Sequence, residues 1–180
     1  MDFRSVFLKI TAALRSESVD FALIGGFALA ALKVPRATSD LDLLADGLRA
    51  DDVDRIMREL GYDVLHRSHD AANYASENTR LGRVDFLFAR RTYTRSMLAR
   101  AVAHRVFARH RVKVVQPEDL IGLKVQSSAN NPRRKQLDMS DIARLLDAHP
   151  ALDLDRVRDY FRLFDREGEL DALLADRQKR

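Results

Sequence analysis

The sequence predicts an α+β protein, in which a mixed β-sheet flanked by helices is followed by a helical C-terminal part. Short apolar segments that alternate with polar residues, as strands do, are concentrated in the first half of the chain. After residue 116 the apolar residues recur at helical spacing, and Pro117 stands at a typical helix start with acids behind it. We therefore expect an α/β core over residues 1–116 and a helical region over residues 117–180 packed on it, together one compact unit.

Size and composition limit the class of protein. The chain has 180 residues, 46% of them hydrophobic, which fits one domain with an ordinary core and excludes global disorder. It has no cysteine, so disulfides and thiolate metal sites are excluded. A net charge of +4 permits a nucleic-acid or nucleotide partner without requiring one. The N-terminus does not read as a signal peptide and there is no long apolar run, so we expect a soluble, cytoplasmic protein with no membrane partner.

The expected elements follow from local patterns. Apolar residues at helical spacing predict a helix over residues 50–60, with Asp51 or Asp52 capping its start and Gly61 at its end. The other helices are expected over residues 3–15, 27–33, 92–104, 117–128, 137–149, 154–164 and 169–176. Strands are expected over residues 20–26, 39–45, 62–66, 71–77 and 82–89, with a further strand or a hairpin over residues 105–117.

Two aspartates lie two residues apart on one of these strands. Asp40 and Asp42 alternate with Leu41 and Leu43, so the acids share one face and the leucines take the buried face. Side by side, the two carboxylates repel each other unless a cation neutralises them. Carboxylate oxygens suit Mg²⁺, and a pair of ions about 3.5–4 Å apart activates an attacking oxygen and stabilises a leaving one. If the strand that carries Asp85 pairs beside them, a three-acid metal cluster results.

A pair of glycines precedes these aspartates. Gly25 and Gly26 end an apolar strand and open a short helix, where backbone N–H groups bind phosphate and missing side chains allow close approach. A plain strand–helix turn also uses glycine, and the two interpretations are compatible. Neither a Walker A motif nor a dinucleotide-binding fingerprint is present.

Together these residues resemble a known pattern. Gly25-Gly26, thirteen residues, Asp40-Leu41-Asp42-Leu43 and the later Asp85 are similar to the nucleotidyltransferase domain of the DNA polymerase β superfamily. The spacing from Arg36 through Thr38 to Asp40, and the downstream "PEDLIGLKVQSS…RRKQLDMSDIARLL", resemble the minimal AbiEii-type enzymes of abortive-infection and toxin–antitoxin systems. The resemblance covers roughly residues 21–147. It departs at Gly26, where many members of the superfamily have serine and its hydroxyl contact to phosphate.

The resemblance implies a mixed sheet, an NTP donor and Mg²⁺, with two ions held by Asp40, Asp42 and Asp85. It implies that Lys124 reaches the donor triphosphate, although the bland alternative is a lysine that snorkels along a helix surface. Asp138 and Asp141, three apart on a helix, either hold Lys124 or Arg133 or are surface charges.

Two further residues of the spacing have open roles. Arg36 pairs either with the triphosphate or with Asp42, and Thr38 is expected to orient a carboxylate. With Gly25 and Gly26 they form the expected nucleotide-binding set.

The acceptor is not readable from the sequence. In such families it ranges over tRNA ends, proteins and small molecules, and a cognate antitoxin is a further expected partner, while the oligomeric state stays open. The basic run over residues 104–113, with Phe107 inside it, either tracks an RNA backbone or is a strand with one solvated face. A catalytically silent protein that binds nucleotide, RNA or a partner on the same fold is the alternative to a nucleotidyltransferase.

Overall fold

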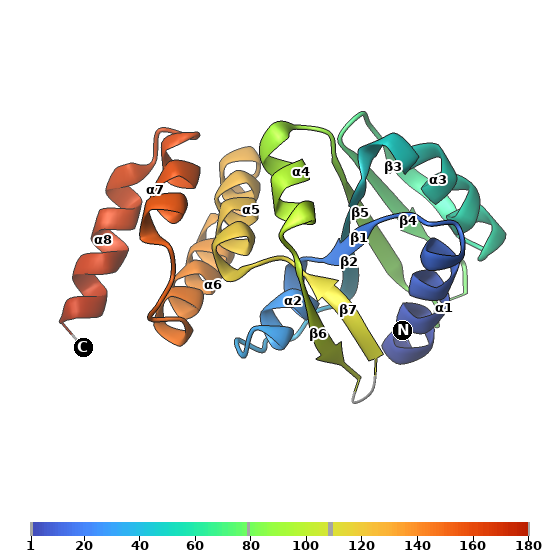
Figure 1. Cartoon of the computed structure of the whole chain (residues 1–180), viewed down its shortest axis with the longest axis horizontal. Helices are drawn as coiled ribbons and strands as arrows, with labels where there is room; N and C mark the ends of the chain where they lie inside the picture. Colours follow the sequence, from blue (N-terminus) through green and yellow to red (C-terminus); the bar gives the residue numbers. More distant parts are fainter. Residues whose placement is uncertain (1, 79, 108–109, 180) are drawn as a thin grey trace. The chain divides into compact units, whose positions relative to one another are not determined.

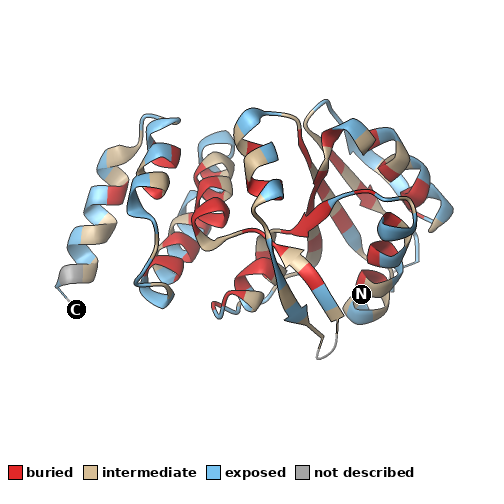
Figure 2. Cartoon of the chain, viewed as in Figure 1, coloured by how far each residue is buried: buried red, intermediate tan, exposed pale blue. Residues whose placement is uncertain are grey.

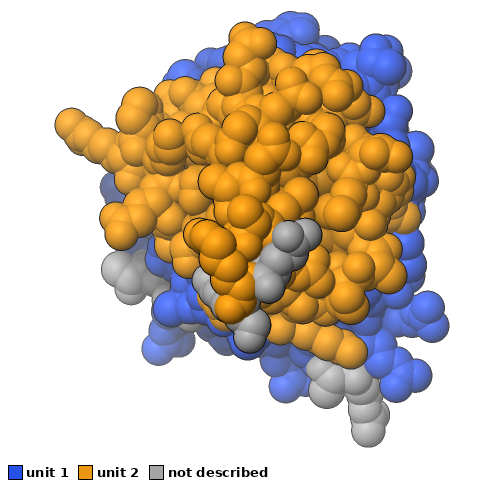
Figure 3. All heavy atoms as spheres, turned by 90° about the vertical axis from the view of Figure 1, so that its left-hand side faces the viewer, with its two compact units in different colours: residues 1–31, 35–115 blue, residues 32–34, 116–180 orange. Residues whose placement is uncertain are grey.

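The structure, a computed structural model, describes residues 2–78, 80–107 and 110–179 (Figure 1). The chain divides into two compact units, coloured separately in Figure 3. Unit 1 comprises residues 1–31 and 35–115, and unit 2 comprises residues 32–34 and 116–180. The sheet belongs to unit 1, whereas unit 2 is helical. The predicted α+β class with a mixed sheet is therefore confirmed.

Unit 1 is built on one seven-stranded sheet with the order β3-β4-β5-β2-β1-β7-β6. Its strands are β1 (Phe21–Leu23), β2 (Asp40–Asp46), β3 (Asp63–Arg67), β4 (Ala71–Ala75), β5 (Arg83–Ala89), β6 (Val102–Val106) and β7 (His110–Val114). β2 pairs parallel to β5 and β1 pairs parallel to β7, and the other pairs are antiparallel. The sheet is thus mixed, and β2, which carries Asp40 and Asp42, lies at its centre.

Helices in unit 1 connect the strands and cover them. They are α1 (Phe3–Ser16), α2 (Gly25–Ala31), the 3-10 turn η1 (Gly47–Arg49), α3 (Ala50–Glu59) and α4 (Thr92–Ala99). α1 packs against α3, α2 packs on β2, and α4 packs on β2 and β5. Figure 2 shows the buried residues concentrated along the central strands and on one side of each helix.

Two sequence predictions for unit 1 were wrong. Neither Asp51 nor Asp52 caps α3, because both lie in its first turn. The turn η1 runs directly into α3, and Asp46 caps the start of η1: Asp46 Oδ1 accepts a hydrogen bond from Leu48 N at 3.0 Å. The helix expected over residues 92–104 ends at Ala99 instead. Its expected C-terminal part is β6, which forms a hairpin with β7.

Unit 2 consists of four helices and a short 3-10 turn. These are α5 (Pro117–Asn130), η2 (Pro132–Arg134), α6 (Lys135–Ala148), α7 (Leu154–Arg162) and α8 (Glu167–Gln178). α5 packs on both α6 and α7. Gly122 makes room for Tyr160, because a Cβ at Gly122 would lie 2.6 Å from Cγ of the tyrosine ring. The apolar faces of α7 and α8 contribute Val157, Phe161 and Leu170 to the buried core of the chain. Within the described part of the chain, no helix has the length and apolar character needed to cross a membrane.

Candidate active site

Strand register brings two of the three predicted aspartates side by side and leaves the third on the same face of the sheet. Asp42 on β2 lies directly opposite Asp85 on β5, and Asp40 lies opposite Arg83. Because β2 and β5 are parallel neighbours in the sheet, the side chains of Asp42 and Asp85 project to the same face. Leu41 and Leu43, which alternate with the acids, are almost completely buried, at 1% and 0% exposed. The predicted pairing of these two strands and the shared face of Asp40 and Asp42 are both confirmed.

Asp85 has a partner that the sequence analysis missed. Asn73 on β4 lies opposite Asp85 in the antiparallel register, and its Nδ2 donates a hydrogen bond to Asp85 Oδ1 at 2.7 Å. The strand β4 reads Ala-Asn-Tyr-Ala at Ala72–Ala75, with Ala72 and Tyr74 fully buried on the other face. In the sequence, the only sign of this contact is that the polar Asn73 alternates with residues of the buried face of β4.

The first glycine of the turn lies against an aspartate. Gly25 has a φ of +62°, a conformation that disfavours other residues, and a Cβ built on it would lie 1.9 Å from Oδ2 of Asp42. Ile24 N donates to Asp42 O at 3.1 Å, which ties the turn to β2. Gly25 therefore has two independent reasons to be glycine, its backbone conformation and the close approach of a carboxylate.

The second glycine lies against Thr38. A Cβ on Gly26 would lie 2.5 Å from Cβ and 2.6 Å from Oγ1 of Thr38. The Thr38 hydroxyl donates to Asp40 O at 3.3 Å, so it contacts the backbone of Asp40 rather than a carboxylate. Arg36 Nη1 donates to Ala37 O at 2.8 Å. Gly25, Gly26, Thr38 and the Asp40–Asp42 segment thus form one continuous group of contacts.

The donor set suits a hard divalent cation. Among the residues that the structure describes, no three His, Asp or Glu side chains converge into a group able to hold a metal ion by themselves. Mg²⁺ is usually bound by one or two carboxylates together with water and substrate phosphates, so it does not need an all-protein cage. The carboxylates of Asp42 and Asp85 on one face, with Asp40 beside them and a side-chain-free turn against Asp42, fit that mode of binding.

Lys124 belongs to unit 2 and is buried there. Its Nζ lies 2.9 Å from Asp138 Oδ1 and 2.7 Å from Asp141 Oδ2, and the lysine is 4% exposed. The expectation that these two acids hold Lys124 is confirmed, and the alternative of a snorkelling lysine is wrong. Arg134 Nε lies 3.5 Å from Asp138 Oδ2, a buried oxygen that has no hydrogen-bond partner among the described residues.

The basic run over residues 104–113 forms the β6–β7 hairpin. Ala108 and Arg109 within it lie outside the described residues. Phe107 packs against Phe7 and Phe27, with ring centroids 5.3 and 5.9 Å apart, so its ring belongs to an aromatic cluster. The described part of the run lies mainly on two strands, as the alternative of a strand with one solvated face expected.

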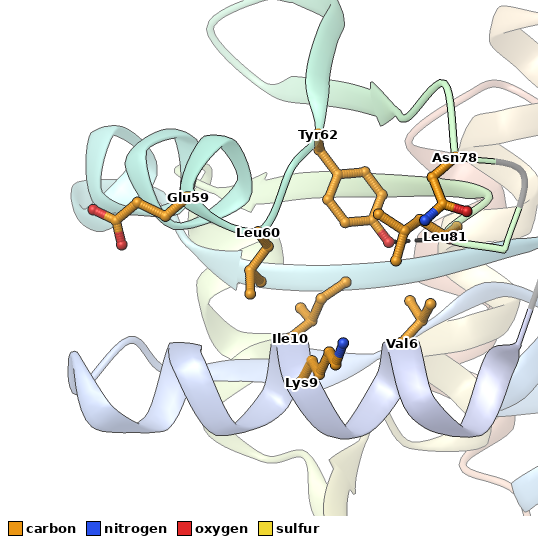
Figure 4. Close-up of a pocket in the computed structure, with 8 residues that line it drawn as sticks. All are labelled: Val6, Lys9, Ile10, Glu59, Leu60, Tyr62, Asn78 and Leu81. Atoms are coloured by element: carbon orange, nitrogen blue, oxygen red, sulfur yellow. Dashed lines mark hydrogen bonds between the residues drawn. The ribbon is translucent and has the colours of Figure 1, made fainter.

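A cavity lies on another part of unit 1. It has a volume of about 380 Å³ and is lined by residues from α1, the end of α3, the following Tyr62 and the segment before β5 (Figure 4). Tyr62 reaches across it and donates to Leu81 O at 3.0 Å. None of the predicted site residues lines this cavity.

Comparison with known protein families places the chain among the nucleotidyltransferases. Residues 4–174 match the family described as "Nucleotidyl transferase of unknown function (DUF2204)". The chain belongs to this family, and the prediction that it is a nucleotidyltransferase is confirmed. A search of curated proteins returned no match.

Solved structures with the same fold include antibiotic-modifying enzymes. The antibiotic-resistance factor ANT(2'')-Ia is 20% identical, with a TM-score of 0.65 and 100% of both chains covered. The lincosamide antibiotic adenylyltransferase LnuA is 15% identical, with a TM-score of 0.55 over 78% of this chain and 94% of LnuA. An antigenic nucleotidyltransferase-like protein from Paracoccidioides brasiliensis is 17% identical, with a TM-score of 0.55 over 94% of this chain and 91% of that protein. These similarities concern the fold.

Proposed function

We propose that the chain transfers a nucleoside monophosphate from an NTP to a hydroxyl acceptor and that pyrophosphate is released. The observation that carries this proposal is the register pair of Asp42 with Asp85, with Asp40 on the same face and Gly25 against Asp42. This arrangement places carboxylates on one face of the sheet, with the Asp42 carboxylate filling the space that a Cβ of Gly25 would take. Such carboxylates suit Mg²⁺ that is bound jointly by the protein and by substrate phosphates.

The roles of the residues follow from their positions. Asp40, Asp42 and Asp85 would hold Mg²⁺, which supplies charge neutralisation on the phosphates and lowers the pKa of the acceptor hydroxyl. Gly25 and Gly26 are proposed to offer backbone N–H groups to the triphosphate, although Gly26 is itself buried against Thr38. The acceptor oxygen forms a bond to the α-phosphorus, the bond from that phosphorus to pyrophosphate breaks, and the hydroxyl proton passes to Asp85.

Three further residues complete the proposed set. Thr38 lies against Gly26, and Arg36 precedes Thr38 by two residues in the chain; both are proposed to contact the donor. Lys124 is proposed as a further phosphate contact. Its ammonium is held by Asp138 and Asp141, so in this role a phosphate oxygen would be a third partner of its three N–H groups.

The acceptor that we propose to test first is a small molecule with a free hydroxyl. Two of the proteins with this fold bind small molecules of this kind: ANT(2'')-Ia was solved in complex with adenylyl-2''-tobramycin, and LnuA with lincomycin bound. The AbiEii-type assignment, a toxin role, an RNA or protein acceptor and an antitoxin partner stay predictions.

The test is transfer of label from each α-labelled NTP, with Mg²⁺, to panels of small-molecule hydroxyl compounds, total RNA and protein. Asp40→Asn and Asp42→Asn are expected to lower transfer by on the order of 100-fold or more, because charge stabilisation at the phosphates is lost. Asp46→Asn is the matched control, since Asp46 ends the same strand and its cap acceptor oxygen is retained. Transfer that survives in both variants would refute the assignment, and Mg²⁺-dependent NTP binding without transfer to any acceptor would favour the catalytically silent alternative.

A further inference from the structure

Asn73 is the only polar side chain that β4 places on the face of the aspartates. The strand runs from Ala71 to Ala75, and the residues that share this face with Asn73 are two alanines, Ala71 and Ala75. Asparagine is disfavoured inside strands, and β4 is an interior strand between β3 and β5. An amide at this position therefore calls for a specific reason.

The reason is visible in its contact. Asn73 Nδ2 donates to Asp85 Oδ1 at 2.7 Å across the directly opposed positions of β4 and β5. Ala72 and Tyr74 are 0% exposed on the opposite face, which fixes the orientation of β4 and hence of the amide. The amide comes from a rigid strand rather than from a loop, so the carboxylate that it holds has one preferred orientation.

The row of opposed residues continues to the metal-binding strand. Asp85 lies between Asn73 on one side and Asp42 on the other, so the three side chains form one cross-strand row. A hydrogen bond to Oδ1 from the β4 side restrains rotation of the Asp85 carboxylate relative to Asp42. Polar groups that orient ligating carboxylates in this way commonly affect metal affinity by about 10–100-fold.

We propose that Asn73 is a positioning residue that holds Asp85 in the orientation needed to bind a divalent cation opposite Asp42. The proposal rests on the proposed function, because it assigns Asp85 to the metal site. It goes beyond that function in placing part of the site on β4, a strand that carries none of the three acids. Asn73 acts through Asp85 and does not itself bind the cation.

The proposal is tested by measuring the affinity of the protein for Mn²⁺ from the spectroscopic signal of the unbound ion. The measurement is made in the presence of α,β-methylene ATP, a donor analogue that does not react. Asn73→Leu keeps the branched shape and the number of side-chain heavy atoms and removes the donor, and it is expected to weaken binding of the Asp85-dependent ion by about 10-fold. Asn73→Gln, which keeps an amide, is expected to retain part of the affinity. Ala71→Ser, on the same face of the same strand, is the matched control and is expected to bind as the wild type does.

A double-mutant comparison separates positioning from a general structural effect. If Asn73 acts through Asp85, Asn73→Leu causes no further loss of Mn²⁺ affinity in the Asp85→Asn background. Equal losses in both backgrounds, or wild-type binding by Asn73→Leu, would overturn the proposal and leave the proposed function standing. Failure of the wild type to bind Mn²⁺ with the analogue would overturn both. Should Asn73→Leu not fold, Asn73→Ala, which also removes the donor, carries the same comparison.

Discussion

Replacing Gly25 by alanine tests the close contact on which the site geometry depends. The φ of Gly25 is +62°, and a Cβ there would lie 1.9, 2.4 and 2.7 Å from Oδ2, Cγ and Cβ of Asp42. The left-handed backbone alone costs an alanine about 1–2 kcal/mol. Forcing the Asp42 side chain aside adds roughly 1–3 kcal/mol, the usual range for overpacking. We therefore expect the free energy of unfolding to fall by about 2–5 kcal/mol in Gly25→Ala.

Gly61→Ala provides the matched control. Gly61 has a φ of +85°, and a Cβ on it would have no described atom within 4 Å apart from those of its chain neighbours, so alanine there meets backbone strain without a clash. Its expected cost is about 1–2 kcal/mol. The difference between the two variants isolates the contact of residue 25 with Asp42.

Urea denaturation of both variants measures this difference, and Mg²⁺-dependent NTP binding measures its consequence for the site. Gly25→Ala is expected to lose stability and NTP binding, whereas Gly61→Ala loses only stability. In an Asp42→Gly background the extra cost of Gly25→Ala is expected to disappear, because the clashing atoms are gone. Equal costs for Gly25→Ala and Gly61→Ala would refute the reasoning, since they would mean that the Asp42 carboxylate does not lie against the turn.

Two further predictions concern buried polar groups. Lys124→Met is expected to lower the free energy of unfolding by about 3–5 kcal/mol, because Asp138 and Asp141 lose the cation that they share. Adding Asp138→Asn and Asp141→Asn to the same chain should recover much of this loss. A loss below about 1 kcal/mol in urea denaturation of Lys124→Met would contradict this expectation. Burial raises the pKa of Tyr62 to about 12. The pKa of tyrosine in the unfolded chain is about 10, so the folded state is stabilised fully below pH 10. This contribution to stability is lost as the pH rises from about 10 towards 12. In Tyr62→Phe, the free energy of unfolding should fall less steeply between about pH 10 and 12 than it does in the wild type. At neutral pH this variant should be less stable by about 1 kcal/mol, because the hydrogen bond to Leu81 is lost. An unchanged dependence on pH would show that Tyr62 does not cause it.

Most of the fold was predictable because its strands and helices bury one face. β2 alternates acids with buried leucines, and α3 carries its apolar residues on one side, so the period of each pattern identifies the element. The hairpin was expected over residues 105–117, but the start of β6 was assigned to a helix because β6 is an edge strand with mostly exposed residues, including Val102 at 51% exposed, so no alternation marks it. The alanines and arginines before it also extend the helical propensity of α4 beyond its true end at Ala99.

The site was predictable as far as local spacing determines it. The shared face of Asp40 and Asp42 follows from the period of a strand alone, whereas the opposition of Asp42 and Asp85 depends on which strands become neighbours. The hydrogen bond from Asn73 depends on the antiparallel register of β4 with β5, and a polar residue between apolar ones predicts only an exposed face. Contacts set by the pairing of separate strands are therefore the part that the sequence did not show.

Gly26 shows how a contact of this kind changes the meaning of a residue. From the sequence resemblance alone, Gly26 stands where a serine is expected and looks like the loss of a hydroxyl from the glycine turn. In the structure, however, the Thr38 hydroxyl lies 2.6 Å from the place where a Cβ of residue 26 would be. Since real Cβ atoms do not approach other heavy atoms so closely, a serine at position 26 and Thr38 in its present position exclude each other. The hydroxyl that lies beside the turn is therefore that of Thr38, and Thr38 can occupy this position only because residue 26 is glycine.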